Sequence, residues 1–381
     1  MTRKSNKARN GRDAASPKRI NVALQGGGSH GAFTWGVLDR LLEEDAIEID
    51  GLSGTSAGAM NAVVLAEGLV EGGRPRARAQ LADFWAAVSR EAVFSPIQRT
   101  VFDAFAAGWS LPGHPALLWF DIATQLFSPY QFNPLNINPL RALLLKEVDF
   151  DKVRACRDLQ IFVSATNVYS GRSRVFTGAD LTVDAVMASA CLPQLYQAVT
   201  IDGEPYWDGG YMGNPVLHPF FGTCTSRDIL LVQINPIRRP TTPTTAREIH
   251  DRVNEISFNS SLVRELMHVE FINDALRQGD LAGRGYHEVF LHLIAGGEAL
   301  ARETASSKLN AEWSFLTYLR DLGRAAAEEW IRSHFDRLGR KSTMDLTEFR
   351  VKEGAPPVAR PSPPIVAPAR PRATRRKPTS A

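Results

Sequence analysis

Cysteines are few, and none falls in a spacing that binds metal or builds a disulfide framework. The three cysteines, at positions 156, 191 and 224, are an odd number, lie far apart and include no CxxC pair. They therefore indicate reduced thiols. The segment HEVFLH at 287–292 is one residue too long for an HExxH zinc motif, and no carboxylate cluster of the calcium-loop type is present. We predict no metal ion and no organic cofactor.

Long apolar runs are also missing. No stretch approaches the roughly 18 consecutive apolar residues of a membrane-spanning helix, and the basic segment before Ile20 lacks the apolar core of a secretory signal. The sequence therefore predicts a cytoplasmic protein.

The body of the chain carries no excess of positive charge. The net charge of +3 comes from the ends, because residues 1–19 hold seven Lys/Arg against one acid and residues 355–381 hold six against none, which leaves −9 for the remainder. We therefore expect no nucleic-acid partner. The predicted disordered tails are residues 1–18 and the proline-rich residues 355–381. Two roles stay open for them: solvated linkers, or peripheral attachment to an anionic membrane surface.

Between the tails, short apolar runs alternate with helical patterns. Strands are predicted at 20–24 and 47–52, each followed by a glycine turn and a helix. This order predicts a parallel sheet with helices on both faces. Further predicted elements are strands at 160–166, 174–176 and 229–234 and a long helix at 244–278, with an interruption near 257–261 left open.

Residues 72–150 break this alternation. They hold many aromatic residues among prolines and glycines, which predicts a mostly helical cap inserted into one domain spanning 19–354. The aromatic residues have two candidate uses, as the core of the cap or as the wall of an acyl-chain site.

The segment Gly54-Thr55-Ser56-Ala57-Gly58 matches G-x-S-x-G. Its flanking glycines permit a strained turn from strand to helix that exposes the central serine. Such a turn places the Ser56 hydroxyl at a helix N-terminus, where the helix dipole stabilises developing negative charge. The alternative is an ordinary glycine turn in which Ser56 only caps the helix.

A second glycine-rich segment follows the first predicted strand: Gly26, Gly27, Gly28, Ser29, His30 and Gly31. Backbone N–H groups in such a loop can point at an anion without interference from side chains. One interpretation is a dinucleotide site, with Asp50 as the ribose-binding acid. The other is an oxyanion hole for acyl transfer. The oxyanion hole gives Ser56 a role, which a dinucleotide site does not.

The third segment is Asp208-Gly209-Gly210, an acid before a glycine turn. The order of glycine loop, serine turn and acid resembles the patatin-like phospholipases, whose pattern is G-G-G-x-[KR]-G, G-x-S-x-G and D-G-[AG]. The resemblance continues through residues 187–193 and covers roughly 19–300. It implies a three-layer α/β/α fold with a mainly parallel sheet.

The resemblance also implies an activity, the hydrolysis of acyl esters in phospholipids or neutral lipids. Ser56 is then the nucleophile, Asp208 its partner in a Ser-Asp dyad, and the amides around Gly27, Gly28 and Ser29 the oxyanion hole. Since a carboxylate with a pKa of about 3.9 is a poor base at neutral pH, we expect partial desolvation to raise the Asp208 pKa.

One position departs from the pattern. His30 stands where the family has Lys or Arg, so positive charge on the loop is expected to depend on protonation of an imidazole with an ordinary pKa of about 6.5.

Two alternatives to the dyad hydrolase stay open. One is a Ser-Asp-His triad esterase, for which the candidate bases are five histidines later in the chain than Asp208: His218, His250, His268, His287 and His292. The other is a nucleotide- or lipid-binding regulatory protein whose site is idle.

Overall fold

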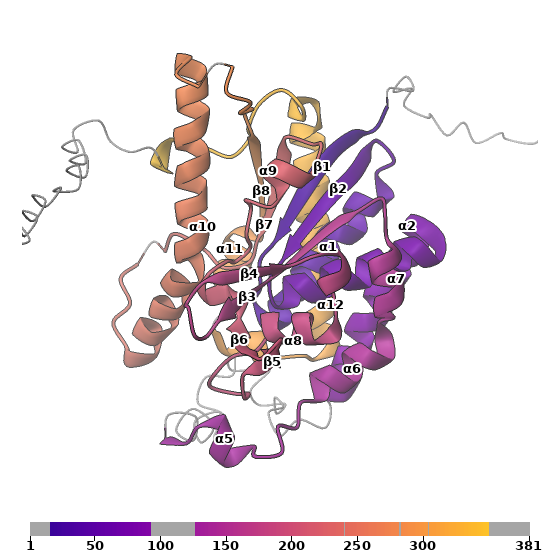
Figure 1. Ribbon diagram of the computed structural model, residues 1–381, viewed down its shortest axis with the longest axis vertical. Helices are drawn as coiled ribbons and strands as arrows, with labels where there is room; N and C mark the ends of the chain where they lie inside the picture. Colours follow the sequence, from indigo (N-terminus) through magenta and orange to yellow (C-terminus); the bar gives the residue numbers. More distant parts are fainter. Residues whose placement is uncertain (1–15, 93–125, 240, 282, 304, 350–381) are drawn as a thin grey trace, which may run out of the picture.

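The computed structural model describes residues 16–92, 126–239, 241–281, 283–303 and 305–349 (Figure 1). Within them, eight strands form one sheet in the order β5-β6-β3-β2-β1-β7-β8, with β4 paired to β3. The strands are β1 (Lys18–Leu24), β2 (Ile47–Gly54), β3 (Gln160–Asn167), β4 (Ser173–Phe176), β5 (Val199–Ile201), β6 (Glu204–Asp208), β7 (Asp228–Gln233) and β8 (Phe290–Ala295).

The sheet is mainly parallel, as expected. Strands β3, β2, β1, β7 and β8 run in one direction. Strands β4 and β6 run antiparallel to β3, and β5 runs antiparallel to β6. The strand predicted at 174–176 is β4, which is not the buried strand that its apolar pattern indicates: it is mostly half-buried, because it pairs with β3 alone and lies off the main order.

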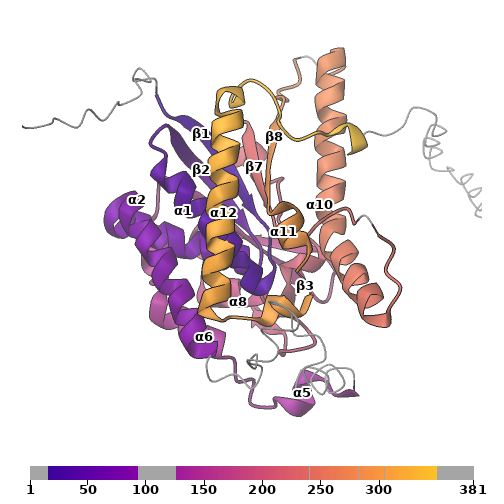
Figure 2. The ribbon, with the colours of Figure 1, turned by 180° about the vertical axis from the view of Figure 1, so that it is seen from behind.

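Helices cover both faces of this sheet, which gives the three-layer arrangement (Figures 1 and 2). The longer ones are α1 (Gly31–Glu43), α2 (Ala57–Ala92), α10 (Ala246–Gln278) and α12 (Trp313–His334). Shorter ones are α5 (Pro129–Phe132), α6 (Pro139–Glu147), α7 (Phe150–Ala155), α8 (Val183–Ser189), α9 (Phe220–Thr223) and α11 (Gly297–Ala301). The 3-10 turns are η1 (Gly28–His30), η2 (Gly178–Asp180), η3 (Gly209–Tyr211), η4 (Ala305–Leu309), η5 (Phe335–Arg337) and η6 (Thr347–Phe349).

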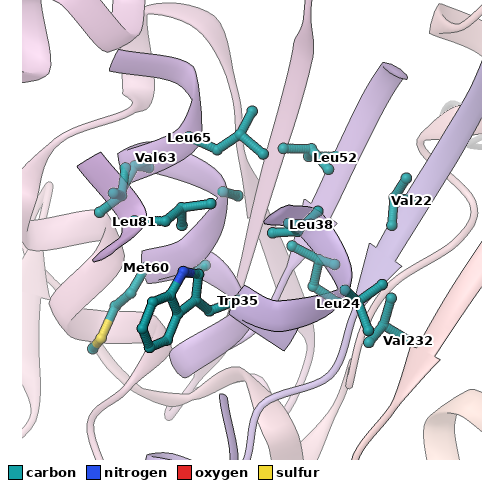
Figure 3. Close-up of a cluster of buried hydrophobic side chains, with 14 of the residues drawn as sticks. Val22, Leu24, Trp35, Leu38, Leu52, Met60, Val63, Leu65, Leu81 and Val232 are labelled. Atoms are coloured by element: carbon teal, nitrogen blue, oxygen red, sulfur yellow. The ribbon is translucent and has the colours of Figure 1, made fainter. Parts of the chain in front are cut away.

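The larger hydrophobic core lies between the sheet and the layer formed by α1, α2 and α12. Figure 3 shows part of it, where Leu24 of β1 and Leu52 of β2 lie beside Leu38 of α1 and Leu65 of α2. Helices α1 and α12 approach so closely that Gly36 faces the backbone of α12 directly, so no larger side chain fits there. Burial of apolar surface at about 25 cal/mol per Å² holds these layers together.

A smaller core lies on the opposite face, under α10. Leu262 and Leu266 of α10 pack against Ile229 and Leu231 of β7 and Leu291 of β8. Helix α10 continues through 257–261 without the interruption that the sequence left open, and its side chains there meet the loops at the end of the sheet.

The predicted cap at 72–150 is described only in part, since 93–125 lies outside the described residues, as do residues 1–15 and 350–381. The described parts share the large core of the sheet: Phe84, Trp85, Leu143 and Leu144 are all buried in it. Helix α2 bends at Gly72 and Gly73 and then continues toward Ala92. No described helix combines the length and apolar composition that crossing a bilayer requires.

Candidate active site

The glycine loop and the serine turn lie at the same edge of the sheet. Neighbouring strands β1 and β2 are parallel, and their last residues, Leu24 and Gly54, are paired. The chain leaves β1 into the glycine loop and leaves β2 into the turn that carries Ser56. In α/β sheets, the carboxyl ends of parallel strands form the ligand-binding edge.

The serine turn has the strained geometry that the G-x-S-x-G pattern predicts. Ser56 has φ +54°, which is rare for a residue with a side chain, and α2 begins at the next residue. A Cβ on Gly54 would lie 2.5 Å from the Gly58 carbonyl oxygen, so the turn needs glycine there. Ser56 is partly exposed while Thr55 and Ala57 are buried. The turn therefore presents Ser56 to the outside.

Side chains behind the turn hold it in place. The Ser56 N–H donates to Ser189 Oγ over 2.8 Å. Thr55 Oγ1 lies 2.7 Å from Ser164 Oγ and donates to the Gly213 carbonyl over 2.6 Å. These buried hydrogen bonds fix an otherwise unfavourable backbone conformation.

The glycine loop presses directly on the serine turn. A Cβ on Gly26 would lie 2.8 Å from Ser56 Cβ and 2.7 Å from the Thr55 carbonyl oxygen. Gly28 has φ +58°, in the left-handed region that favours glycine. The two motifs therefore form one site.

Only some of the loop amides are available to bind an oxyanion. The Gly26 N–H donates to Asn214 Oδ1 over 2.7 Å, and the His30 N–H donates to the Gly27 carbonyl over 3.2 Å. The Gly31 N–H donates back to the Gly28 and Ser29 carbonyls. Of the six predicted loop residues, Gly26, His30 and Gly31 thus have engaged amides. Across the described part of the chain, no group accepts a hydrogen bond from the amides of residues 27–29.

We expect Asn214→Ala to misplace the glycine loop. Asn214 is fully buried, and its loss leaves the Gly26 N–H without an acceptor, which costs about 1–3 kcal/mol of folding stability. Because the freed amide can turn, kcat should fall roughly 10- to 100-fold with little change in KM. Ester hydrolysis and urea unfolding would measure both effects.

Asn273→Ala is the matched control. Asn273 of α10 is also buried and also accepts from a backbone N–H, that of Val289 over 3.0 Å, but Val289 directly precedes β8, at the amino edge of the sheet. It should lose similar stability and keep kcat. Equal losses of kcat in both variants would contradict the role assigned to Asn214.

Asp208 reaches the same edge from an antiparallel strand. It ends β6 opposite Ala165 of β3, and Val163 of β3 pairs with Gly54 of β2, so Asp208 lies level with Ser56. Its backbone N–H donates to the Cys191 carbonyl over 2.7 Å, and its Oδ1 accepts from the Gly210 N–H over 2.7 Å.

Burial brings the pKa of Asp208 close to neutral pH. The side chain is almost fully buried, and this burial raises its pKa to about 7, against the lowering effect of hydrogen bonds from the Gly210 N–H and the Ser56 hydroxyl. The rise expected from the sequence is present. The effect of the Ser56 hydroxyl on this pKa shows that the two predicted catalytic side chains lie close together.

The expectation that His30 carries conditional positive charge is wrong. His30 is buried, and its Nε2 lies 2.7 Å from Ser307 Oγ. Burial, and then the charge of Lys308, lower the His30 pKa to about 3. His30 is therefore neutral at any pH near neutrality.

The five candidate histidines of the triad are engaged or exposed elsewhere. His292 is buried with its Nε2 2.8 Å from Asp228 Oδ1. Asp228 is the first residue of β7, so this pair sits at the amino edge of the sheet, opposite Ser56. The other four are exposed: His218, His250, His268 and His287.

Asp50, the acid of the dinucleotide interpretation, has a structural role. It is the extra residue in β2 where the pairing with β1 shifts register. Its Oδ2 accepts hydrogen bonds from the backbone of Thr225 and Ser226 over 2.6 Å and 2.9 Å. This position is away from the carboxyl edge where a ribose would bind. Among the described residues, no cluster of three His, Cys, Asp or Glu side chains is arranged to hold a metal ion.

Several supporting residues of the site belong to none of the three motifs. Gln25 Oε1 accepts from the N–H groups of Ile234 and Asn235. Asn235 Nδ2 in turn donates to the Gly26 carbonyl over 2.8 Å. Both residues come just after a parallel strand, the position where polar side chains reach the ligand-binding edge. Asn214 gives no comparable signal in the sequence.

Comparison with known proteins gives a family. The model of the family described as Patatin-like phospholipase matches residues 22–221, which is more than half of the chain and includes all three motifs. No protein with a curated description matches. Among solved structures, VipD from Legionella pneumophila is similar, with 15% identity and a TM-score of 0.34 over 80% of this chain and 67% of that chain.

Proposed function

Because this chain belongs to the patatin-like phospholipase family, we propose that it hydrolyses acyl esters of lipids with Ser56 as nucleophile and Asp208 as base. The observation that carries this proposal is the buried Asp208 carboxyl, whose pKa burial raises to about 7 and which lies close enough to the Ser56 hydroxyl for that hydroxyl to affect this pKa. A carboxylate that titrates near neutral pH can take and return a proton during catalysis.

The first half of the reaction forms an acyl-enzyme. Asp208 takes the proton of the Ser56 hydroxyl while Oγ attacks the ester carbonyl, and the carbonyl oxygen becomes an oxyanion. The amides of Gly27, Gly28 and Ser29 are the candidate donors for it, since none of them is engaged within the described chain. When the intermediate collapses, the ester bond breaks and protonated Asp208 gives its proton to the leaving alcohol.

The second half releases the fatty acid. Asp208 takes a proton from water as that water attacks the acyl carbon, and the proton then returns to Ser56 Oγ as the acyl-enzyme bond breaks. The enzyme ends in its starting state. Every step uses residues of this chain at one edge of the sheet.

A panel of lipid esters tests this proposal. We expect release of free fatty acid from phospholipid, lysophospholipid or neutral lipid, with kcat rising as the pH rises and half-maximal near pH 7. The direction follows from the chemistry, because only the ionised Asp208 is a base and ionisation increases above its pKa. Mass spectrometry of the products at pH 5 to 9 measures both the release of fatty acid and its dependence on pH. A rate that falls through this range would contradict the role of Asp208.

A binding protein with an idle site is the second candidate, and labelling by a serine-directed probe separates it from the hydrolase. Cytoplasmic location and membrane attachment through the basic tails stay predictions, since both tails lie largely outside the described residues.

A further inference from the structure

The glycine loop rests on a segment that is distant in the sequence. A Cβ on Gly28 would lie 2.5 Å from the Lys308 carbonyl oxygen and 3.4 Å from Lys308 Cβ. Ser307, the residue before, holds the His30 ring through the 2.7 Å contact. Two adjacent residues of η4 therefore contact the two ends of η1.

The Lys308 side chain also reaches the start of the loop. Its ammonium donates to Asn235 Oδ1 over 2.6 Å, and Asn235 Nδ2 donates to the Gly26 carbonyl over 2.8 Å. Asn235 thus connects a cation to the residue that presses against Ser56. Because Asn235 is buried, little solvent screens this connection.

The surroundings of Lys308 are electrostatically mixed. The pKa of its ammonium is lowered, mainly by burial; the nearby carboxylates of Glu255 and Asp251 on α10 oppose this lowering, and the charge of Arg239 adds to it. Arg239 itself pairs with Glu255. The charge of Lys308 in turn lowers the His30 pKa, which places that charge within electrostatic reach of the loop.

We propose that Lys308 is a positioning residue that supplies positive charge beside the oxyanion loop. This charge takes the place of the Lys or Arg that the family pattern puts at position 30, where this chain has a neutral, buried His30. The inference rests on the proposed function. A cation behind the loop stabilises negative charge that develops in front of the Gly27 and Gly28 amides, and its bond to Asn235 holds the loop in place.

Lys308→Met is the first test. It keeps most of the side-chain volume and removes the charge, so we expect kcat to fall roughly 10- to 100-fold with KM little changed. Lys18→Met is the matched control, since Lys18 is also half-buried and donates to the Phe335 and Leu338 carbonyls at the other edge of the sheet. It should keep wild-type kcat.

Chemical modification separates charge from packing. Lys308→Cys treated with 2-bromoethylamine carries an aminoethyl group that restores an ammonium at the length of lysine, whereas iodoacetamide adds a neutral group of similar size. We expect the first adduct to recover most of the lost kcat and the second to recover none. Wild-type protein treated with the same two reagents controls for modification of the native cysteines. Burial raises the pKa of each of these thiols, which slows their reaction.

The outcomes decide between the two proposals. Wild-type kcat in Lys308→Met, or equal recovery by both adducts, overturns the role of Lys308 while leaving the hydrolase standing. If the wild type releases no fatty acid, the proposed hydrolase function is wrong. NMR titration of His30 then still tests whether the charge of Lys308 acts on the loop. The His30 pKa should rise in Lys308→Met, and an unchanged His30 titration would show that Lys308 places no charge at the loop.

Discussion

Replacing Ser56 with alanine is expected to abolish ester hydrolysis, with kcat lowered by about 10⁴-fold or more. Without Oγ no acyl-enzyme forms, and only the oxyanion donors and substrate binding remain to assist attack by water. A fluorophosphonate probe should add its mass to the wild type and not to the variant. Fatty-acid release and intact-protein mass spectrometry measure the two effects.

The fold of this variant should survive. Alanine at 56 keeps the backbone N–H that donates to Ser189, and it loses only a small, partly exposed hydroxyl. The positive φ at this position strains alanine as it strains serine. A wild type that resists the probe would favour a binding protein over a hydrolase, and a Ser56→Ala variant with full turnover would remove Ser56 from the mechanism.

Asp208→Asn should lower kcat by roughly 10³- to 10⁴-fold at pH 8, because an amide cannot accept the serine proton. The remaining activity should also lose the rise with half-maximum near pH 7, since that rise reports ionisation of Asp208. Rates measured from pH 5 to 9 give both results. Full activity in this variant, or an unchanged pH profile, would show that another group is the base.

The same substitution should stabilise the protein at high pH. The Asp208 pKa is raised from its ordinary value to about 7 in the folded state, so folding favours the protonated acid. As the pH rises from about 4 to about 7, the unfolded chain gives up its proton first and wild-type stability falls, by at most about 4 kcal/mol. Asparagine removes this loss.

Urea unfolding at pH 5 and pH 8 checks the direction. Asp208→Asn should gain stability over the wild type as the pH increases, and this difference isolates Asp208 from the other titrating groups. A catalytic substitution that loses activity and gains stability is typical of a site where function keeps a charge buried at a cost. A variant that is less stable than wild type at pH 8 would contradict the buried-carboxylate account.

The sheet and the three motifs were predictable because they depend on local patterns. Apolar runs marked β1, β2, β3 and β7, and the glycine loop and the serine turn each followed a strand that was already expected. Strand β6, which carries Asp208, was not predicted. Their meeting at one edge follows from the parallel direction of β1 and β2, which the alternating order of elements indicated.

The supports of the site were not predictable, because they depend on contacts between distant residues. The sequence suggested that His30 is a titratable cation. In the structure its ring is buried against Ser307, a residue 277 positions later in the chain. The Gly26 N–H looked like an oxyanion donor, but Asn214, 188 residues away, accepts from it. A motif specifies which backbone groups are candidates, and only packing determines which of them remain free.

The dependence of the glycine loop on η4 has a consequence for how the protein is made. A ribosome adds about 5–20 residues each second, so Ser307 follows His30 by roughly 15 to 55 s. During that interval the nascent chain can hold β1, β2 and the serine turn, but it has neither the backbone that supports Gly28 nor the Lys308 ammonium. The loop therefore gains its last support only when nearly the whole domain has been synthesised, and a growing chain carries the nucleophile well before its oxyanion loop is complete.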